Sequence, residues 1–338
     1  MSSFFITQNS EVATSFADSA PAVSSAGGIS PIKAALVAAG ILLSLASGTQ
    51  IQAQTEGPQR TRTLVRVISP KGKEQETPQK TDLRLRLNGH GTDLLALNPV
   101  LATDGRGVEI ALLIDDGLRG NFSTNLNDLR GFIQELPSNA TVGIGYLQNG
   151  RVNFAAPIGA EREAAVKAVR IPLGSVGISA SPYFCLSELV KHWPSNTNAA
   201  RVVLMITNGI DPYNGSTSPL NQNSPYVATA VTDAQKAGVA VYSIYWGGAA
   251  LGFSRGSFSG QSYLQQVAEG TGGDSYNQGS INPPSITPYL KQFQHALEET
   301  YSATFLASGN KPVAIKVTAN THGVKVIAPT LVQPGTGS

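Results

Sequence analysis

The sequence predicts an α/β protein: a mainly parallel central sheet with helices on both faces, flanked by small β segments at both ends. From residue 108 to 279, short apolar runs alternate with stretches of helical periodicity, as in a parallel sheet covered on both sides. Residues 64–97 and 301–329 instead contain short runs in which apolar and polar residues alternate, which is typical of half-buried strands. We therefore expect both flanks to form β-structure beside the central region.

Composition limits the classes of function. The 338 residues suffice for one large or two modest domains, and 41% of them are hydrophobic, as in a globular protein. The net charge is only +2 and no Lys/Arg cluster stands out, which argues against nucleic-acid binding. The single cysteine, Cys185, excludes an intrachain disulfide and cysteine-based zinc sites, and its apolar neighbours predict a buried, inert thiol.

The N-terminal region has the features of an export signal. Lys33 precedes 13 small or apolar residues (34–46), and a small, polar stretch leads to a cleavage position after Ala53. This apolar run is shorter than the ~20 residues of a membrane-spanning helix. We predict that residues 1–53 are a signal peptide or an uncleaved anchor, and that the protein is secreted or lies in the periplasm or cell envelope. The alternative is a disordered cytoplasmic tail, and the membrane is a partner only through an uncleaved segment.

The rest of the chain divides into three predicted parts: a linker and β-rich flank (54–107), a central domain (108–282) and a C-terminal helix with a strand flank (283–333). In the first flank, strands at 64–69 and 83–87 surround a solvated loop. Asn88-Gly89 is a hairpin turn signal, and Arg84 and Arg86 are expected to face solvent.

In the central domain, apolar runs predict strands at 108–114, 141–147, 152–157, 201–207, 239–246 and 274–277. Apolar residues at helical spacing predict helices at 125–137, 161–170, 181–194, 224–238, 262–273 and 288–299. Ser181 and Ser224 are expected N-caps, because each is followed by a proline at the first helical position. In the C-terminal flank, strands are predicted at 301–307, 313–319 and 324–329.

Three short motifs follow strands or precede a helix at one edge of the predicted sheet. Asp115-Asp116-Gly117-Leu118-Arg119 ends the first central strand, Ser179 and Ser181 precede a helix, and Thr207-Asn208-Gly209 ends the fourth strand. With the strand order, they resemble the von Willebrand factor type A (VWA) domain. With both flanks included, the chain is most similar to VWA-related proteins described for acidobacteria, which are exported. The resemblance implies a Rossmann-like sheet with a metal ion held by Asp-x-Ser-x-Ser, a Thr and an Asp.

The motifs depart from that pattern, which predicts a degenerate metal-ion-dependent adhesion site without a cofactor. Gly117 supplies no side-chain oxygen, and the permanent charge of Arg119 would compete with a cation for the acids. We expect Arg119 to replace the metal by pairing with Asp115 or Asp116, although a plain surface arginine is equally compatible with the sequence. In the alternative, Mg²⁺ or another divalent cation (Mn²⁺, Ca²⁺) is retained, and its ligands are Asp115, Asp116, Ser179, Asn208 and Asp211.

The same edge carries a long loop, residues 208–226, in which Tyr213 and Tyr226 stand among Asn and Ser. This composition favours recognition of a protein or glycan, whereas the three prolines of the loop would also suit packing onto its own domain. We predict non-catalytic binding, adhesion or scaffolding through this face. Its predicted residues are Asp115, Asp116, Arg119, Ser179, Ser181, Asn208, Asp211 and Tyr213.

A remote alternative is serine hydrolysis. The segment "GFSRG" (252–256) fits a Gly-x-Ser-x-Gly elbow around Ser254, and Asp274 with His295 or His322 follows in hydrolase order. However, an elbow requires a tight strand-to-helix turn, and we expect residues 256–261 to separate Ser254 from the next helix. The four histidines are scattered without a ligand-spaced pair, which argues against a histidine zinc site, and no glycine-rich phosphate motif predicts a nucleotide cofactor.

Overall fold

The computed structural model of the protein describes residues 57–70, 77–102, 106–118, 121–174, 181–214, 223–247, 255–279 and 282–337. All of these lie in one compact unit, residues 55–338. Within the described ranges, no helix combines the length and apolar character needed to cross a membrane.

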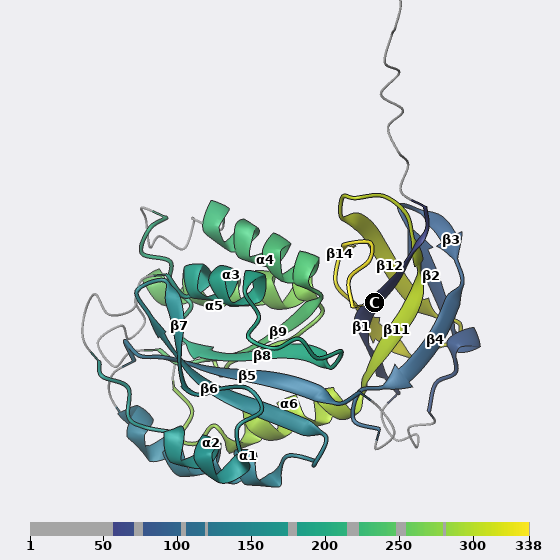
Figure 1. Cartoon of the computed structure of the whole chain (residues 1–338). Coiled ribbons are helices and arrows are strands. Elements are labelled where there is room, and N and C mark those ends of the chain that lie inside the picture. The colour runs from purple at the N-terminus through teal and green to yellow at the C-terminus, as the bar shows by residue number, and fades with distance from the viewer. Residues whose placement is uncertain are drawn as a thin grey trace, which may run out of the picture. The chain divides into compact units, whose positions relative to one another are not determined.

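A six-stranded sheet forms the centre of this unit, in the order β10-β9-β8-β5-β6-β7 (Figure 1). All neighbouring strands are parallel except β7, which runs antiparallel to β6 at one edge. Because the chain leaves β5 toward β6 and later crosses to β8, the carboxyl ends of β5 and β8 flank the point where the winding reverses. Open α/β sheets bind ligands at such a point. The strands are β5 (Val108–Asp115), β6 (Ala140–Gln148), β7 (Arg151–Ala156), β8 (Ala200–Thr207), β9 (Val239–Tyr245) and β10 (Ser275–Tyr276).

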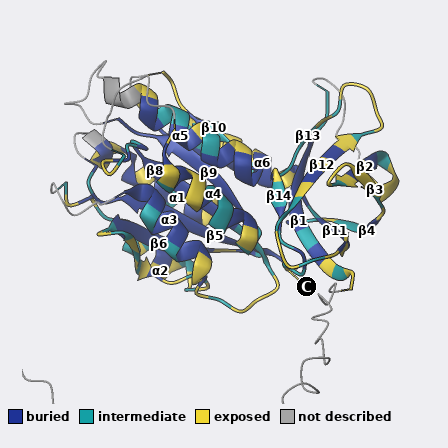
Figure 2. Cartoon of the chain, turned by 90° about the horizontal axis from the view of Figure 1, so that it is seen from above, coloured by how far each residue is buried: buried dark blue, intermediate teal, exposed yellow. Residues whose placement is uncertain are grey.

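Helices cover both faces of the sheet (Figure 1). One face packs against α1 (Leu126–Glu135), preceded by the 3-10 turn η2 (Asn121–Asn125), and against α2 (Arg162–Ala168) and α6 (Thr287–Glu298). The other packs against α3 (Pro182–Lys191), α4 (Pro225–Ala237) and α5 (Arg255–Thr271). All eight residues of β5 are buried, as the central strands in Figure 2 show. The predicted fold class, a covered and mainly parallel sheet, is confirmed.

Local signals account for most element ends. The Ser181 hydroxyl accepts a hydrogen bond from the Tyr183 N–H (3.3 Å), and the Ser224 hydroxyl accepts from two N–H groups of α4, so both predicted N-caps are confirmed. The helix predicted over 161–170 already ends at Ala168, where Val169 turns to an extended conformation and donates its N–H to the Val166 carbonyl oxygen.

The start of α5 also differs from the prediction. This helix begins at Arg255 rather than 262, so residues 256–261 do not delay it. A Cβ on Gly260 would lie 2.1 Å from the Asn208 carbonyl oxygen. The weak helix-formers of this turn therefore permit α5 to pack closely against the loop after β8, and tertiary packing outweighs their low propensity.

The two flanks combine into a pair of antiparallel four-stranded sheets with a shared core. Strands from opposite ends of the sequence pair directly, β1 with β11 and β2 with β12. Asn88 (φ 47°) and Gly89 (φ 85°) form the predicted hairpin turn, and Arg84 and Arg86 are exposed as expected. The first sheet contains β13 (Lys325–Ile327), β1 (Gln59–Ile68), β11 (Thr300–Ala307) and β4 (Leu94–Pro99). The second contains β14 (Leu331–Val332), β12 (Val313–Ala319), β2 (Leu83–Leu87), which follows the 3-10 turn η1 (Lys80–Asp82), and β3 (His90–Thr92).

Candidate functional site

Asp115 is the last residue of β5, at the carboxyl edge of the central sheet. Its Oδ1 accepts a hydrogen bond from the Gly117 N–H (2.9 Å), and its Oδ2 accepts from the Thr207 hydroxyl at the end of β8 (2.7 Å). Both Asp115 and Thr207 are buried. The carboxylate therefore ties together the two strand ends that flank the winding reversal.

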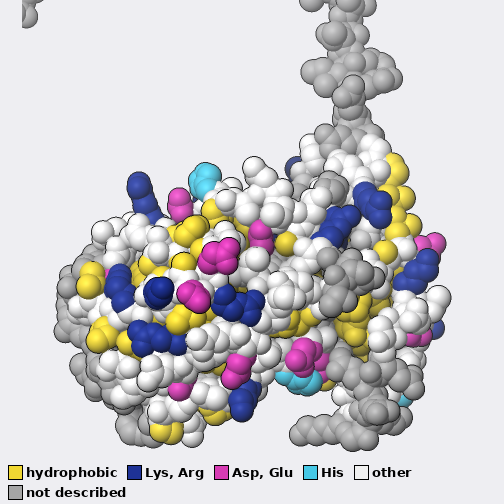
Figure 3. Space-filling view, turned by 60° about the horizontal axis from the view of Figure 1, so that its bottom comes forward, with side chains coloured by type: hydrophobic (Ala, Val, Ile, Leu, Met, Phe, Trp, Pro, Cys, Tyr) yellow, Lys and Arg dark blue, Asp and Glu magenta, His cyan; other side chains and the backbone are white. Residues whose placement is uncertain are grey.

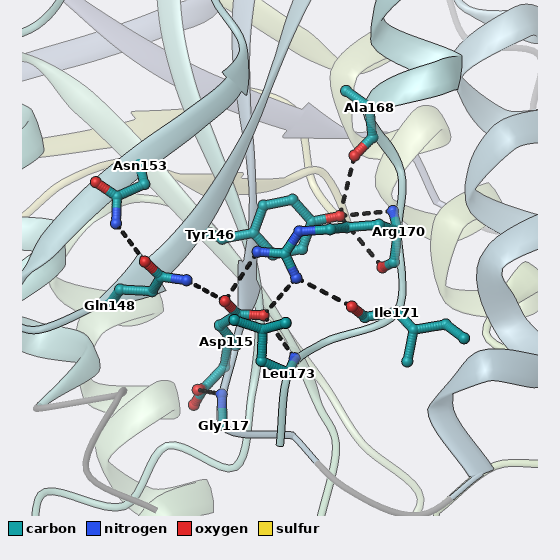
Figure 4. Close-up of polar contacts among 10 residues, drawn as sticks. Asp115, Gly117, Tyr146, Gln148, Asn153, Ala168, Arg170, Ile171 and Leu173 are labelled. Atoms are coloured by element: carbon teal, nitrogen blue, oxygen red, sulfur yellow. Dashed lines mark hydrogen bonds and ion pairs between the residues drawn. The ribbon is translucent and has the colours of Figure 1, made fainter. Parts of the chain in front are cut away.

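Asp116 is completely buried and is paired with Arg170, which Figure 4 shows beside Tyr146 and Ile171. The Arg170 guanidinium donates to both carboxylate oxygens, with distances of 2.7 Å to Oδ1 and 2.9 Å to Oδ2. The Leu173 N–H also donates to Oδ1 (2.9 Å), and the Gln148 side-chain amide donates to Oδ2. Each oxygen thus accepts two hydrogen bonds, and the bidentate geometry is the strong form of this pair.

Arg170 is held in place by Tyr146, which lies on β6. The guanidinium lies over the Tyr146 ring at 3.7 Å from its centroid, a cation–π contact. The Tyr146 hydroxyl accepts a hydrogen bond from the Arg170 N–H (2.7 Å) and donates to the Ala168 carbonyl oxygen (3.1 Å). These contacts fix the segment after α2 against the sheet, so the ion pair is pre-organised.

The two charges stabilise each other. Burial raises the pKa of Asp116, but the hydrogen bonds from Arg170, Leu173 and Gln148 outweigh it and hold the pKa below its usual range. The hydrogen bond to Asp116 raises the pKa of Arg170. Both groups therefore stay charged at neutral pH.

The arginine paired with Asp116 is thus Arg170, whereas the sequence pointed to Arg119. Arg119 and Ser179 lie outside the described residues. The sequence near Arg170 offers only Pro172, which disfavours a helical conformation at Ile171 and so prevents the preceding helix from continuing past this point. Nothing in the sequence indicates its partner, which is 54 positions away.

The other predicted oxygen ligands at this edge have structural partners. Asp211 accepts hydrogen bonds from the Tyr213 N–H (3.2 Å) and the Ser224 hydroxyl (2.7 Å). The Asn208 side-chain oxygen accepts from the Ile210 N–H (2.9 Å). These bonds shape the loop between β8 and α4.

The donor set was tested against the divalent cation that the VWA resemblance implies. Asp115, Asp116, Asn208 and Asp211 each accept hydrogen bonds from the protein, and the acceptor sites of Asp116 are filled by the guanidinium, an amide and a backbone N–H. A cation that needs several free oxygens would have to displace these donors. In this arrangement, the described residues of the predicted ligand set do not fit a divalent cation. Within the described ranges, no cluster of three or more His, Cys, Asp or Glu residues could hold a metal ion.

Three large apolar side chains are exposed at this carboxyl edge. Ile171 (59% exposed) and Leu173 (58%) belong to the segment that carries Arg170, and Tyr213 (57%) follows β8. The Tyr213 ring lies 5.1 Å from Phe184, which also contacts Tyr226 at 4.8 Å. We call Ile171, Leu173 and Tyr213 the apolar rim.

No protein-family model and no curated protein matches the sequence. Among solved structures, the chain is similar to the conserved hypothetical protein BatB from Bacteroides thetaiotaomicron (13% identity, 57% of this chain and 98% of that chain, TM-score 0.43). It is also similar to the SpRpn10 VWA domain (9% identity, 55% of this chain and 94% of that chain, TM-score 0.38). A third similar structure is the pilus adhesin SpaC from Lactobacillus rhamnosus GG (11% identity, 80% of this chain and 41% of that chain, TM-score 0.42). The predicted resemblance to VWA domains, and the closer likeness to acidobacterial proteins, both stay predictions.

Residues proposed for the remote hydrolase alternative have other partners. Asp274 pairs with Arg66 at 3.0 Å, and His295, which is exposed, contacts Glu298 (3.2 Å) and Glu299 (3.4 Å). Ser254 lies outside the described residues. Cys185 is buried, and burial raises the pKa of its thiol to about 12, so it is not a thiolate nucleophile at neutral pH.

Proposed function

We propose that this chain is an exported, non-catalytic binding or scaffold protein that recognises a protein or glycan ligand at the carboxyl edge of its central sheet, without a divalent cation. One observation carries the proposal: the buried Asp116 carboxylate is neutralised by Arg170 within the protein itself. Export is part of the proposal because residues 34–46 resemble a secretory signal.

The same contacts that neutralise Asp116 also present the apolar rim. Leu173 donates its N–H to Asp116 while its side chain remains 58% exposed, and Ile171 accepts a hydrogen bond from the Arg170 guanidinium through its carbonyl oxygen (3.0 Å). Pre-ordered apolar and aromatic side chains lose little entropy on binding and are enriched at interface cores. In this proposal, the ion pair replaces the cation as the element that organises the face.

Removal of a rim side chain is expected to weaken binding of a cell-envelope ligand. The full chain would be immobilised and tested against cell-envelope proteins and polysaccharides from the producing organism, with and without EDTA. Leu173→Ser and Tyr213→Ser should each lower the affinity about tenfold, because truncation of a central interface residue costs more than ~1 kcal/mol. EDTA should have no effect.

Leu306→Ser is the matched control, since Leu306 is an exposed leucine (43%) on β11. Its binding should equal that of the wild type. Binding that disappears in EDTA, or that falls equally in the Leu306→Ser variant, would contradict the proposal and would favour metal-dependent adhesion or non-specific adsorption, respectively.

A further inference from the structure

A second feature lies at the opposite, amino-terminal edge of the central sheet, where β5, β8 and α4 meet strand β1. Two adjoining hollows, of about 430 and 300 Å³, share Arg62, Asn198 and Ala200 in their walls. We call them together the basic groove, because the described residues of their walls include five basic side chains and no Asp or Glu. The basic residues are Arg60, Arg62, Arg106, Arg201 and Lys236.

The five charges have no acidic partner among the described residues. None of them forms a salt bridge there, although eight other contacts between Lys, Arg or His and an acid do occur. On the face drawn in Figure 3, basic and acidic side chains are interspersed over much of the described surface. These five positive charges also exceed the net charge of the whole chain, +2.

Two of the arginines are held in position by backbone oxygens. Arg62 donates to the Asn198 carbonyl oxygen (3.1 Å), and Arg201 donates to the Ser195 carbonyl oxygen (3.3 Å). Burial lowers the pKa of Arg62, and the neighbouring charges of Arg106 and Arg60 lower it further. The cluster therefore has unfavourable self-repulsion that a bound anion would relieve.

One carboxylate beside this cluster, that of Glu109, has other partners. Glu109 on β5 is in register with Arg201 on β8, yet no ion pair joins them. Glu109 is buried and accepts hydrogen bonds from the side chains of Trp193 (2.7 Å), Ser195 (2.6 Å) and Thr197 (2.6 Å). Three neutral donors thus satisfy the acid, which leaves Arg201 available to the groove.

We propose that the basic groove binds a segment of an acidic polysaccharide. Guanidinium groups suit carboxylate and sulfate geometry, and the amide and hydroxyl groups between them suit sugar hydroxyls. No aromatic side chain is among the described residues of its walls, so it lacks the stacking platform typical of single-stranded nucleic-acid sites. This site goes beyond the proposed function, because it lies one full strand length away from the apolar rim. The polar wall residues are Thr63, Asn98, Asn196, Thr197, Asn198, Ser302, Thr304 and Thr336.

The test is fluorescence anisotropy with the full chain and four labelled probes of matched length: oligogalacturonate, dextran sulfate, neutral dextran and oligo-dT. Arg106→Gln combined with Lys236→Gln should weaken binding of the acidic sugars at least about tenfold, because the variant removes two charged hydrogen-bond donors from the groove. Both residues are exposed, so the variant should fold. Added salt should weaken binding, and neutral dextran should not bind.

The matched control is Arg84→Gln combined with Arg86→Gln, which removes two exposed arginines from β2. It should bind the acidic sugars as the wild type does, as should Leu173→Ser. Binding of oligogalacturonate alone would assign carboxylate groups to the ligand, binding of dextran sulfate alone would assign sulfate groups, and either supports the proposal. No binding of either acidic sugar, tighter binding of oligo-dT, or an equal loss in the β2 control would overturn it.

Discussion

Replacing Arg170 with alanine is expected to lower the free energy of unfolding by about 3 kcal/mol at pH 7, the lower end of the range for breaking a buried ion pair. The Asp116 carboxylate, which is fully buried, would keep only the Leu173 N–H and the Gln148 amide as donors. The lower end applies because the Arg170 side chain is 38% exposed, so solvent already screens part of the interaction. Urea unfolding of the full chain measures this loss.

The effect should depend on pH in a defined direction. In the wild type, the pKa of Asp116 is lowered on folding, so its ionised form stabilises the fold above the unfolded pKa of about 3.9 and this contribution is lost as the pH falls through the lower folded value. Without Arg170, burial would raise the pKa of Asp116 and make its ionised form unfavourable. The difference in stability between wild type and Arg170→Ala should therefore shrink as the pH falls from 7 toward 3.

Two further variants separate the ion pair from general effects. Arg151→Ala removes an exposed arginine from β7 and should change stability little. Arg170→Met combined with Asp116→Asn should recover much of the loss, since no charge is then left buried. An Arg170→Ala protein as stable as the Arg151→Ala protein would show that the ion pair does not stabilise the fold.

The second large effect concerns Arg66, which joins the β1 flank to the α/β part. Its side chain is only 7% exposed and contacts Asp274 at 3.0 Å and Glu299 at 3.8 Å. Arg66→Met keeps the volume but leaves Glu299, whose side chain is 10% exposed, without its guanidinium partner. We expect a loss of about 3 kcal/mol in the free energy of unfolding, measured by urea denaturation.

Arg60→Met is the control for that variant, because Arg60 lies on the same strand but is exposed. Its stability should match that of the wild type. Arg66→Met combined with Glu299→Gln should regain part of the loss. If Arg60→Met and Arg66→Met destabilise equally, the interaction with Glu299 and Asp274 is not the cause.

Much of the fold could be predicted because its signals are local. The apolar run 108–114 predicts a strand that is buried on both faces. In the structure, every residue of β5 is buried. The pairs Ser181-Pro182 and Ser224-Pro225 mark helix starts through cap chemistry that acts within three residues. Asn88-Gly89 specifies its hairpin through backbone conformation alone.

The chemistry of the site was less predictable because its partners are distant in sequence. Arg119 was the predicted partner because it lies three positions from Asp116. The observed partner, Arg170, is 54 positions away and is held by Tyr146 from a neighbouring strand. Arg66 and Asp274 are 208 positions apart. The basic groove likewise exists only where β1 meets the sheet edge. Periodicity and spacing report which face a residue occupies, but not which charge from another element meets it.

The most direct test of the account is a calorimetric titration of the full chain with MnCl2, comparing the wild type with Asp115→Asn. Internal neutralisation of Asp116 by Arg170 predicts that neither protein shows saturable binding at this edge, and that the two titrations are the same. A one-to-one Mn²⁺ site with micromolar affinity in the wild type that is absent from Asp115→Asn would contradict the account. The acids at this edge would then bind a cation, and the Arg170 ion pair would not replace it.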